Sequence, residues 1–351
     1  MHKLEENPVY LQSLDRQARR LAELPEVERL RGKTLMITGS TGQLGVATVN
    51  LAIRLSLLAG LDMRIMAAAR SLDGLERRFG RKALACLTYQ PYEAMEPFEC
   101  SKQVDFAIHC AGYGDPRAFA EDPVGVIRAN IYGLDSLLSF IGRQKTGRVL
   151  FVSSGEIYGQ GAPDVRAFDE CYCGVIDTMN PRSCYQMAKK AGESLCSSFC
   201  SQQGVEVVVA RQCHVFGPGH SSRDSRVTAQ FINAVADGEP VVMKSPGSQV
   251  RSYLHELDAA SSYLFLLMRG VVGQAYNVAP SYETSIKQLA EALCRAGGVE
   301  LRTEATQEDR EQGWGGIARS VLSPAKINAL GWREAMTFEE AVDITVRSLE
   351  R

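Results

Sequence analysis

Two hydrophobic patterns alternate along the chain. Short apolar runs bounded by polar residues or glycine predict strands, at 34–38, 63–69, 83–89, 104–108, 148–152 and 205–210. Longer stretches with apolar residues at helical spacing lie between them, as at 43–59 and 123–143. Strands that alternate with helices in this way predict an α/β fold with a parallel, doubly wound sheet.

The pattern changes at the two ends of the chain. Near the start, leucine and valine recur at helical spacing among charged residues, which predicts a helical extension packed on the main domain. After Arg211 the alternation loosens, and loops with glycine and proline join shorter elements, as expected of a smaller lobe. The apolar stretch 258–269 predicts a helix that returns to the main domain. The predicted extension, main domain and lobe are, in order, 1–31, 32–212 with about 253–272, and 213–252 with 273–351.

Charge and composition exclude some classes of function. The chain has 351 residues, 45% of them hydrophobic, and a net charge of −2. This balance is ordinary for a globular protein and carries no footprint of a nucleic-acid or membrane partner. No apolar stretch approaches the ~18 residues of a membrane span. We therefore expect a soluble, cytoplasmic protein.

The ten cysteines are expected to be reduced thiols that act as small hydrophobic residues. The pairs Cys171-x-Cys173 and Cys196-x-x-x-Cys200 lack the Cys-x-x-Cys spacing of a zinc site. We expect no metal.

The first predicted strand ends in a glycine-rich turn that opens a helix. Gly-x-x-Gly-x-x-Gly in this position lets the backbone approach a pyrophosphate, which then lies at the helix N-terminus. The pattern favours a dinucleotide-binding, Rossmann-type domain over a plain tight turn. The residues expected to contact the cofactor here are Gly39, Thr41, Gly42, Gln43, Leu44 and Gly45.

The cofactor is expected to be NAD, with NADP left open. The second strand ends at Arg70, where NAD-specific sites usually carry an acidic residue, and arginine suits a 2′-phosphate. The small residues Cys110, Ala111 and Gly112 follow the fourth strand, where backbone would lie against the cofactor. Asn130, on the next helix, is also expected at this site.

Tyr185 and Lys189 stand four residues apart, on one face of a predicted helix. We expect the ammonium to lower the pKa of the phenol from ~10 towards neutrality. The fifth strand delivers Ser154 and Glu156 at its carboxyl end, where open α/β sheets place their sites. In this constellation Ser154 binds the reacting hydroxyl, Tyr185 is the acid/base, and Lys189 binds ribose hydroxyls while the nicotinamide carries hydride.

These motifs resemble those of the extended short-chain dehydrogenases/reductases that act on nucleotide sugars, over roughly residues 32–350. The second half is most similar to the UDP-glucuronate decarboxylases (UDP-xylose synthases). The resemblance implies oxidation of a sugar at C4, return of the hydride within one turnover, and decarboxylation, epimerisation or dehydration between the two steps. It also implies a nucleotide-sugar substrate, with a UDP-sugar favoured, and a homodimer. The similar runs are 170–174, 180–185, 224–227, 247–252 and 276–278.

Glu156 discriminates among these reactions. Dehydratases and decarboxylases resemble each other in placing a carboxyl group here, near the sugar C5, whereas simple 4-epimerases usually lack it. Gly155 departs from both groups: it replaces the serine of the decarboxylases and the aspartic acid with which 4,6-dehydratases protonate a leaving hydroxyl.

The resemblance also implies residues for the substrate. Arg226 and Arg251 match positions that contact the diphosphate or, for Arg251, a sugar carboxylate, and a guanidinium suits either group. His214 stands where a substrate-facing asparagine is usual, so a changed substrate contact and a core histidine both stay open. Arg182 and Arg211 are expected to be structural ion-pair partners.

Two alternatives remain. Arg70 motivates an NADPH-dependent reductase of nucleotide-4-keto-sugars. A non-catalytic regulator that binds nucleotide sugars or dinucleotides is of another class, and the intact Ser154, Tyr185 and Lys189 argue against it.

Overall fold

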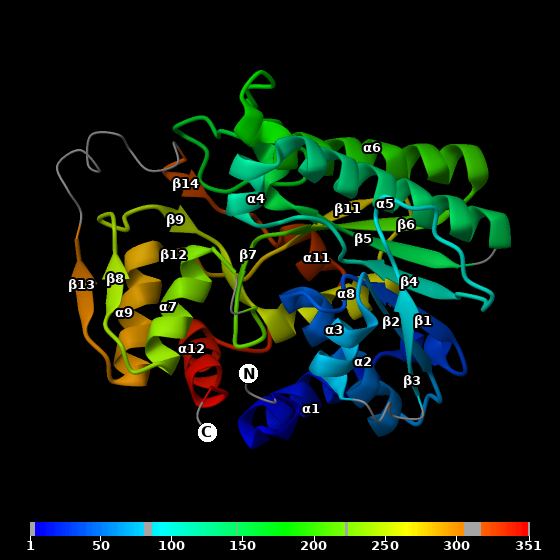
Figure 1. The fold of residues 1–351 in the computed structure, drawn as a ribbon, viewed down its shortest axis with the longest axis horizontal. Helices are drawn as coiled ribbons and strands as arrows, with labels where there is room; N and C mark the ends of the chain where they lie inside the picture. Colours follow the sequence, from blue (N-terminus) through cyan, green and yellow to red (C-terminus); the bar gives the residue numbers. More distant parts are fainter. Residues whose placement is uncertain (1–3, 81–85, 146, 222–223, 305–316, 350–351) are drawn as a thin grey trace.

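The computed structural model describes residues 4–80, 86–145, 147–221, 224–304 and 317–349. Within them, a seven-stranded sheet runs through the larger part of the molecule (Figure 1). Its order is β11-β6-β5-β4-β1-β2-β3, and every neighbouring pair is parallel. The predicted α/β fold with a parallel, doubly wound sheet is confirmed.

Six of the seven strands lie where the hydrophobic runs predict them. The third begins at Leu87 rather than at 83, and residues 81–85 lie outside the described part of the chain. The strands of this sheet are β1 (Thr34–Thr38), β2 (Arg64–Ala69), β3 (Leu87–Pro91), β4 (Phe106–His109), β5 (Arg148–Ser154), β6 (Glu206–Gln212) and β11 (Ala275–Val278).

The position of β11 differs from the predicted bounds of the smaller lobe. Residues 275–278 were assigned to the lobe, but they pair with β6 and form one edge of the large sheet. Their run is four residues long and follows a loop, so the sequence pattern does not separate it from the short elements of the lobe. Burial of Tyr276 and Val278 accounts for its place at the sheet.

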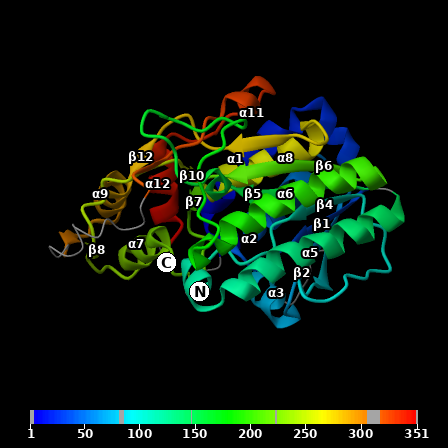
Figure 2. The same cartoon turned by 90° about the horizontal axis from the view of Figure 1, so that it is seen from above.

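Helices cover both faces of the sheet. On one face lie α2 (Gln43–Leu58) and α8 (Glu256–Arg269), and on the other lie α5 (Pro123–Gln144) and α6 (Cys184–Gln203), which run side by side in Figure 2. Side chains of β1 alternate between them, with Leu35 and Ile37 in the core on the α2 side.

The helix α5 is the one described helix that is long and apolar enough to cross a membrane. Half of its apolar window is buried, because it packs on the sheet and on α6, as a core helix of a globular domain does.

The N-terminal extension is helical, as predicted. It consists of η1 (Leu4–Glu6), α1 (Pro8–Ala22) and η2 (Pro25–Leu30), and α1 packs on α2 and α8. Asn7 caps α1 by accepting hydrogen bonds from two backbone N–H groups. Gln17 donates to Asp258 Oδ1 at 2.6 Å, which ties the extension to α8.

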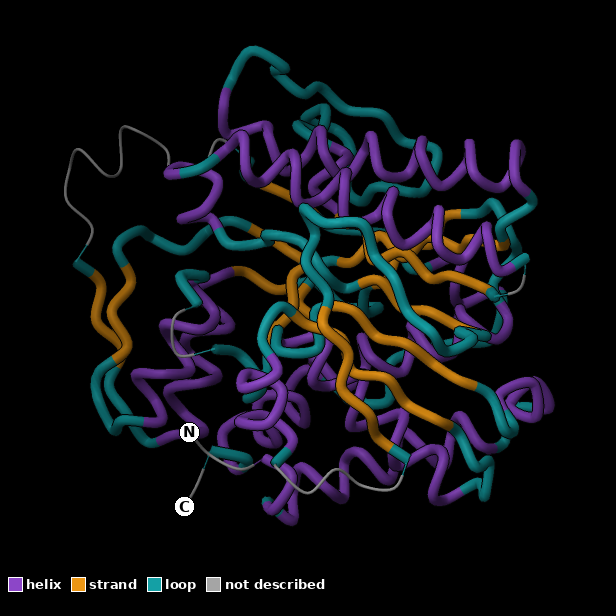
Figure 3. The backbone as a smooth tube through the Cα atoms, turned by 45° about the vertical axis from the view of Figure 1, so that its right-hand side comes forward, coloured by secondary structure: helices purple, strands orange, loops and turns teal. Residues whose placement is uncertain are grey.

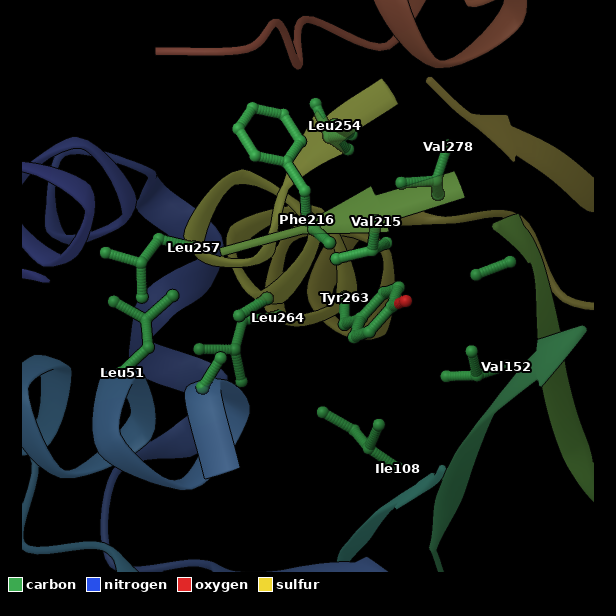
Figure 4. Packing of buried hydrophobic residues seen from close by; sticks show 14 of the residues in the cluster. Leu51, Ile108, Val152, Val215, Phe216, Leu254, Leu257, Tyr263, Leu264 and Val278 are labelled. Atoms are coloured by element: carbon green, nitrogen blue, oxygen red, sulfur yellow. The ribbon is translucent and has the colours of Figure 1, made fainter. Parts of the chain in front are cut away.

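The helix α8 returns to the main domain, as predicted for 258–269. It is buried along nearly its whole length. Figure 4 shows its Leu257 and Leu264 facing Leu51 of α2. Tyr263 of α8 donates to Gln212 of β6 at 2.6 Å, so this helix is bonded directly to the sheet.

The smaller part of the molecule holds short strands around α7 (Val227–Ala236), α9 (Ile286–Gly297) and α12 (Phe338–Arg347) (Figures 1 and 3). Its strand pairs are β7 with β10, β8 with β13, and β9 with β12 and β14.

The bounds of the other elements of the whole molecule are as follows: β7 (His214–Phe216), β8 (Val241–Met243), β9 (Val250–Arg251), β10 (Tyr253–His255), β12 (Thr284–Ser285), β13 (Leu301–Thr303), β14 (Arg319–Ser320), α3 (Leu72–Phe79), α4 (Pro116–Glu121), α11 (Ala325–Ala329), η3 (Gly155–Tyr158) and η4 (Pro181–Ser183).

Candidate active site

The glycine turn between β1 and α2 is shaped by close backbone packing. Gly39 has φ +70°, and a Cβ atom there would lie 2.8 Å from the Ala111 backbone nitrogen. A Cβ at Gly45 would lie 2.2 Å from the Gly39 carbonyl oxygen. Gly42 is open, since its Cβ would meet only that oxygen at 3.4 Å. The turn therefore leaves the N-terminus of α2 accessible, as a pyrophosphate requires.

A cavity of about 450 Å³ extends from this turn. It runs between the ends of β2 and β4 and the start of α5. The predicted cofactor residues that line it are Gly39, Thr41, Gly42, Arg70, Cys110, Ala111 and Gly112. Arg70 donates to the Tyr113 hydroxyl at 3.1 Å, and Arg128 lines the same cavity.

Asn130 lies buried behind the cavity wall. Its Nδ2 donates to the Val126 carbonyl at 2.8 Å, and its Oδ1 has no partner among the described residues. A Cβ at Gly112 would lie 2.4 Å from that oxygen, so Asn130 supports the strand-end backbone rather than lining the cavity itself. The side chains of two other predicted cofactor residues do not line the cavity either. Leu44 packs on the core, and the Gln43 side chain is buried.

A larger groove, about 750 Å³, lies between α9 and residues 334–340. None of the predicted site residues lines it.

The structure brings Ser154, Tyr185 and Lys189 together at the carboxyl end of β5. The Ser154 side chain lies close enough to the Tyr185 phenol to act on its pKa, and its Oγ accepts from the Glu156 N–H at 3.2 Å. Lys189 is buried, and its Nζ donates to the Val152 carbonyl at 2.9 Å and lies 5.8 Å from the centroid of the Tyr185 ring.

The predicted lowering of the Tyr185 pKa is wrong in this structure. Burial, followed by the Glu156 carboxylate, raises the pKa of Tyr185 to about 12, although the Ser154 side chain acts to lower it. Burial also lowers the pKa of Lys189 to about 8. The ammonium is directed at a carbonyl and not at the phenol oxygen, so its effect on the phenol is smaller than the spacing alone suggests.

Glu156 is held beside this group by an arginine. Arg182 donates to the two Glu156 carboxylate oxygens at 3.3 and 3.5 Å. The Arg182 guanidinium lies 4.6 Å from the centroid of the Phe119 ring, and that ring stacks on Tyr185 at 4.8 Å. Arg182 is an ion-pair partner, as predicted, but its partner is a candidate catalytic residue. Phe119 was not predicted, since a lone aromatic residue in α4 carries no motif.

Arg211 has the structural role expected of it. Its guanidinium binds Glu193 through both carboxylate oxygens and donates to the Tyr158 hydroxyl at 2.9 Å. Glu193 accepts in turn from Ser153 at 2.6 Å.

The residues expected at the substrate lie on the side of the smaller lobe. Arg226 forms an ion pair with Asp224, and its charge acts on Tyr185. Arg251 donates to the backbone carbonyls of Val250, Ala318 and Ile317, at distances from 2.7 to 3.4 Å. His214 lies within the field of both arginines. Burial and these two charges lower the pKa of His214 to about 3, so the imidazole is neutral.

Within the described residues, no three His, Cys, Asp or Glu side chains are grouped to hold a metal ion. The ten cysteines are free thiols.

Comparison with known proteins identifies the family of the chain. The model of the NAD dependent epimerase/dehydratase family matches residues 35–279, a span that includes the glycine turn and Ser154, Tyr185 and Lys189. The chain belongs to this family.

Several individual proteins are similar to this chain in sequence. UDP-glucuronic acid decarboxylase 6 of Arabidopsis thaliana is 26% identical over 317 residues, which cover 88% of this chain and 87% of the relative. UDP-glucuronic acid decarboxylase 1 of Xenopus tropicalis is 29% identical over 258 residues, which cover 73% and 58%. The match thus spans less than two thirds of that relative's length. The dTDP-D-glucose 4,6-dehydratase of Homo sapiens is 27% identical over 225 residues, covering 62% and 60%.

Solved structures agree on the fold. UDP-glucose 4-epimerase of Thermotoga maritima, solved with UDP-glucose, has a TM-score of 0.74 at 20% identity and covers 90% of this chain and 98% of its own. The Thermus thermophilus UDP-glucose 4-epimerase, solved with NAD, has a TM-score of 0.74 at 22% identity and covers 90% and 98%.

The structure gives a physical reason for the glycine at position 155. At Gly155 an added Cβ would lie 2.8 Å from the Leu322 side chain. Leu322 is buried and fills the space that a side chain at 155 would take. No acidic or hydroxyl group therefore stands between Ser154 and Glu156.

Proposed function

We propose that the protein converts a nucleotide sugar by transient oxidation at C4, followed by decarboxylation at C5 as in the UDP-glucuronate decarboxylases. The observation that carries the proposal is the Glu156 carboxylate, held by Arg182 next to Ser154 and Tyr185. With glycine at 155, the acid needed for 4,6-dehydration is missing, whereas the glutamate that simple epimerases usually lack is present.

In the first step, Ser154 binds the C4 hydroxyl and Tyr185 takes its proton. When bound, the dinucleotide supplies the hydride acceptor, and its cationic nicotinamide ring favours the phenolate form of the nearby tyrosine. The glycine turn and its cavity fit this group, because Gly42 is open and α2 presents its N-terminus there.

In the second step, the C4 ketone lies β to the C5 carboxylate. The C5–carboxylate bond breaks, carbon dioxide leaves, and the electron pair remains as an enolate. Glu156 would return a proton to C5, and Tyr185 would then give its proton back to the C4 oxygen. A bound dinucleotide would return the hydride taken in the first step, so no net oxidation or reduction is needed.

For the substrate, we propose a UDP-sugar whose diphosphate binds Arg226 and whose carboxylate binds Arg251. His214 is the neutral hydrogen-bonding group beside them. The smaller lobe, 213–252 with the later part of 273–351, would supply these contacts.

A second candidate is the NADPH-dependent 4-keto-sugar reductase. Arg70 and Arg128 in one cavity favour it, since two guanidinium groups suit a 2′-phosphate. Turnover of a nucleotide sugar by the purified protein without added NADPH would exclude it. The non-catalytic regulator predicts that Tyr185→Phe leaves cellular output unchanged.

We also propose a cytoplasmic homodimer that forms through α5 and α6. Ile127 and Tyr132 of α5 are exposed apolar residues on a helix that lies beside α6. Light scattering coupled to size exclusion tests this, with Ile127→Glu expected to give monomers.

Mass spectrometry of products tests the reaction. Purified protein is incubated with UDP-, dTDP-, CDP- and GDP-sugars, including hexuronates. Loss of carbon dioxide from a hexuronate supports the proposal, while loss of water or an unchanged mass with altered retention assigns dehydration or epimerisation instead. No turnover in the whole panel, with no bound dinucleotide, contradicts it.

A further inference from the structure

Gln43 does not use its side chain for the cofactor turn in which it stands. It is the first residue of α2, and its side chain is buried. Its Nε2 donates to Glu256 Oε2 at 2.8 Å and to the Gly217 carbonyl at 3.3 Å. Its Oε1 accepts from Arg226 Nη2 at 2.8 Å. The amide orientation is fixed, since the nitrogen faces two acceptors and the oxygen faces a donor.

Glu256 anchors the other side of this amide. It is fully buried at the start of α8, and both its oxygens accept from the Gly219 N–H, at 3.0 and 2.9 Å. A Cβ at Gly217 or at Gly219 would lie 2.6 Å from the carboxylate, so the loop closes tightly around it. The charged groups that face Glu256 are Arg78 and Arg226. Burial raises the pKa of Glu256 to about 7 in spite of them.

Arg226 completes the link. Its Nε donates to both Asp224 oxygens at 2.9 and 3.0 Å, and its Nη2 is used by Asp224 and Gln43. In the part of the chain that the structure describes, Nη1 makes no hydrogen bond. The neutral amide stands between Glu256 and Arg226, so the Glu256 carboxylate does not bond to the guanidinium directly, and the carboxylate charges that act on Arg226 are those of Asp224 and Asp115.

We propose that Gln43 and Glu256 are positioning residues that couple the dinucleotide turn to Arg226, so that each of the two ligands strengthens binding of the other. The inference rests on the proposed function, in which Arg226 binds the substrate diphosphate. Its physical basis is that Gln43 belongs to the first turn of α2, where the pyrophosphate lies. A shift of that turn on binding moves the hydrogen bond that orients Arg226, and coupling between sites is reciprocal.

The test measures UDP affinity by calorimetry on the full-length protein, with and without saturating NAD. For the natural protein we expect NAD to tighten UDP binding at least about fivefold. Gln43→Met keeps the size of the side chain but removes both hydrogen-bonding atoms. We expect the ratio of UDP affinities with and without NAD to fall close to one in this variant. The affinity for NAD alone should change less than about threefold.

Two further variants separate coupling from damage. Gln17→Met is the matched control, because Gln17 is also buried and its side chain bonds to a buried carboxylate, Asp258, to which neither Gln43 nor Arg226 is hydrogen-bonded. The ratio of its UDP affinities with and without NAD should equal that of the natural protein. Arg226→Ala should weaken UDP binding about tenfold or more, and adding Gln43→Met to it should weaken binding no further. Gln43→Leu replaces Gln43→Met if the latter does not fold.

The outcomes are distinguishable. If NAD leaves the UDP affinity of the natural protein unchanged, or strengthens UDP binding as much in Gln43→Met as in the natural protein, the coupling is overturned. The proposed function then still stands. Unchanged UDP affinity in Arg226→Ala overturns the assignment of Arg226 to the diphosphate in the proposed function, and the coupling with it.

Discussion

Two arginine–glutamate pairs at the carboxyl end of β5 have the same chemistry and different surroundings. Arg211 and Glu193 are joined by bonds of 2.8 to 3.2 Å, and their side chains are 14% and 13% exposed. Arg182 and Glu156 are joined at 3.3 and 3.5 Å, with side chains 48% and 28% exposed. The first pair fixes the strand ends through Ser153 and Tyr158, whereas the second leaves a carboxylate accessible beside Tyr185.

The difference teaches that distance and exposure, not residue type, separate a structural pair from one at a reacting centre. A buried pair loses much when one partner is removed, because the other is left unpaired away from water. An exposed pair contributes little to stability. Substitutions in the buried pair should therefore lower the free energy of unfolding most. Substitutions in the exposed pair should mainly lower activity.

Breaking the buried pair should have the largest effect on folding. Arg211→Met leaves Glu193 buried without its partner, and we expect a loss of about 3–5 kcal/mol in unfolding free energy. Urea denaturation measures this. Arg143→Met, in an exposed pair with Glu99, is the control and should lose under about 1 kcal/mol. Equal losses in both variants would contradict the contrast.

Removing the charge from the exposed pair should affect the reaction instead. Glu156→Gln is expected to lower the rate of product formation about 100-fold, with unfolding free energy changed by less than about 1 kcal/mol. Single-turnover mass spectrometry should find the 4-keto sugar accumulating, because the C4 step uses Tyr185 and Ser154. A full rate of formation of the final decarboxylated product in this variant would remove Glu156 from the C5 step.

A third carboxylate, Glu256, is fully buried and is paired with an amide rather than an arginine, which extends the comparison to pH. The pKa of Glu256 is raised to about 7, so the folded chain keeps its proton at pH values where the unfolded chain has lost it. Stability is therefore greatest below the ordinary value near 4.5 and falls as pH rises from there to about 7, by on the order of 2 kcal/mol.

Glu256→Gln should remove this part of the pH dependence of the melting temperature. The exposed Glu23→Gln should not. Identical pH profiles for Glu256→Gln and the natural protein would mean that the carboxyl is not held neutral by burial.

The smallest effect is expected from a conservative change in the exposed pair. Arg182→Lys keeps the charge but loses the planar group that lies on Phe119 and reaches both Glu156 oxygens. We expect a three- to tenfold lower kcat with little change in KM, measured by steady-state kinetics. A larger rise in KM than fall in kcat would instead place Arg182 against the substrate.

The fold was predictable because its signals are local. Each strand of the sheet except β11 is an apolar run followed by a turn or small residues, and the glycine turn and Tyr185–Lys189 spacing are fixed by a few adjacent positions. The edge strand β11 was missed because its run is four residues long and follows a loop, like the short elements of the lobe.

The site was predictable in its motifs and not in its contacts. Ser154, Tyr185 and Lys189 meet as their spacing predicts, but the pKa of Tyr185 depends on burial and on Glu156, which the helix pattern does not contain. Gln43 was assigned to the cofactor from its place in the turn. Its side-chain partners come from α8 and from the segment before α7, which only the folded chain brings near.

Leu322 bears on how new chemistry can arise in this protein. Its side chain comes from the far end of the chain and fills the space beside Gly155. A side chain added at 155 would meet the Leu322 methyl groups, so Leu322 must shift or be replaced by a smaller residue to admit it. The residues at 155 and 322 therefore constrain each other in evolution, and a change at one favours a compensating change at the other.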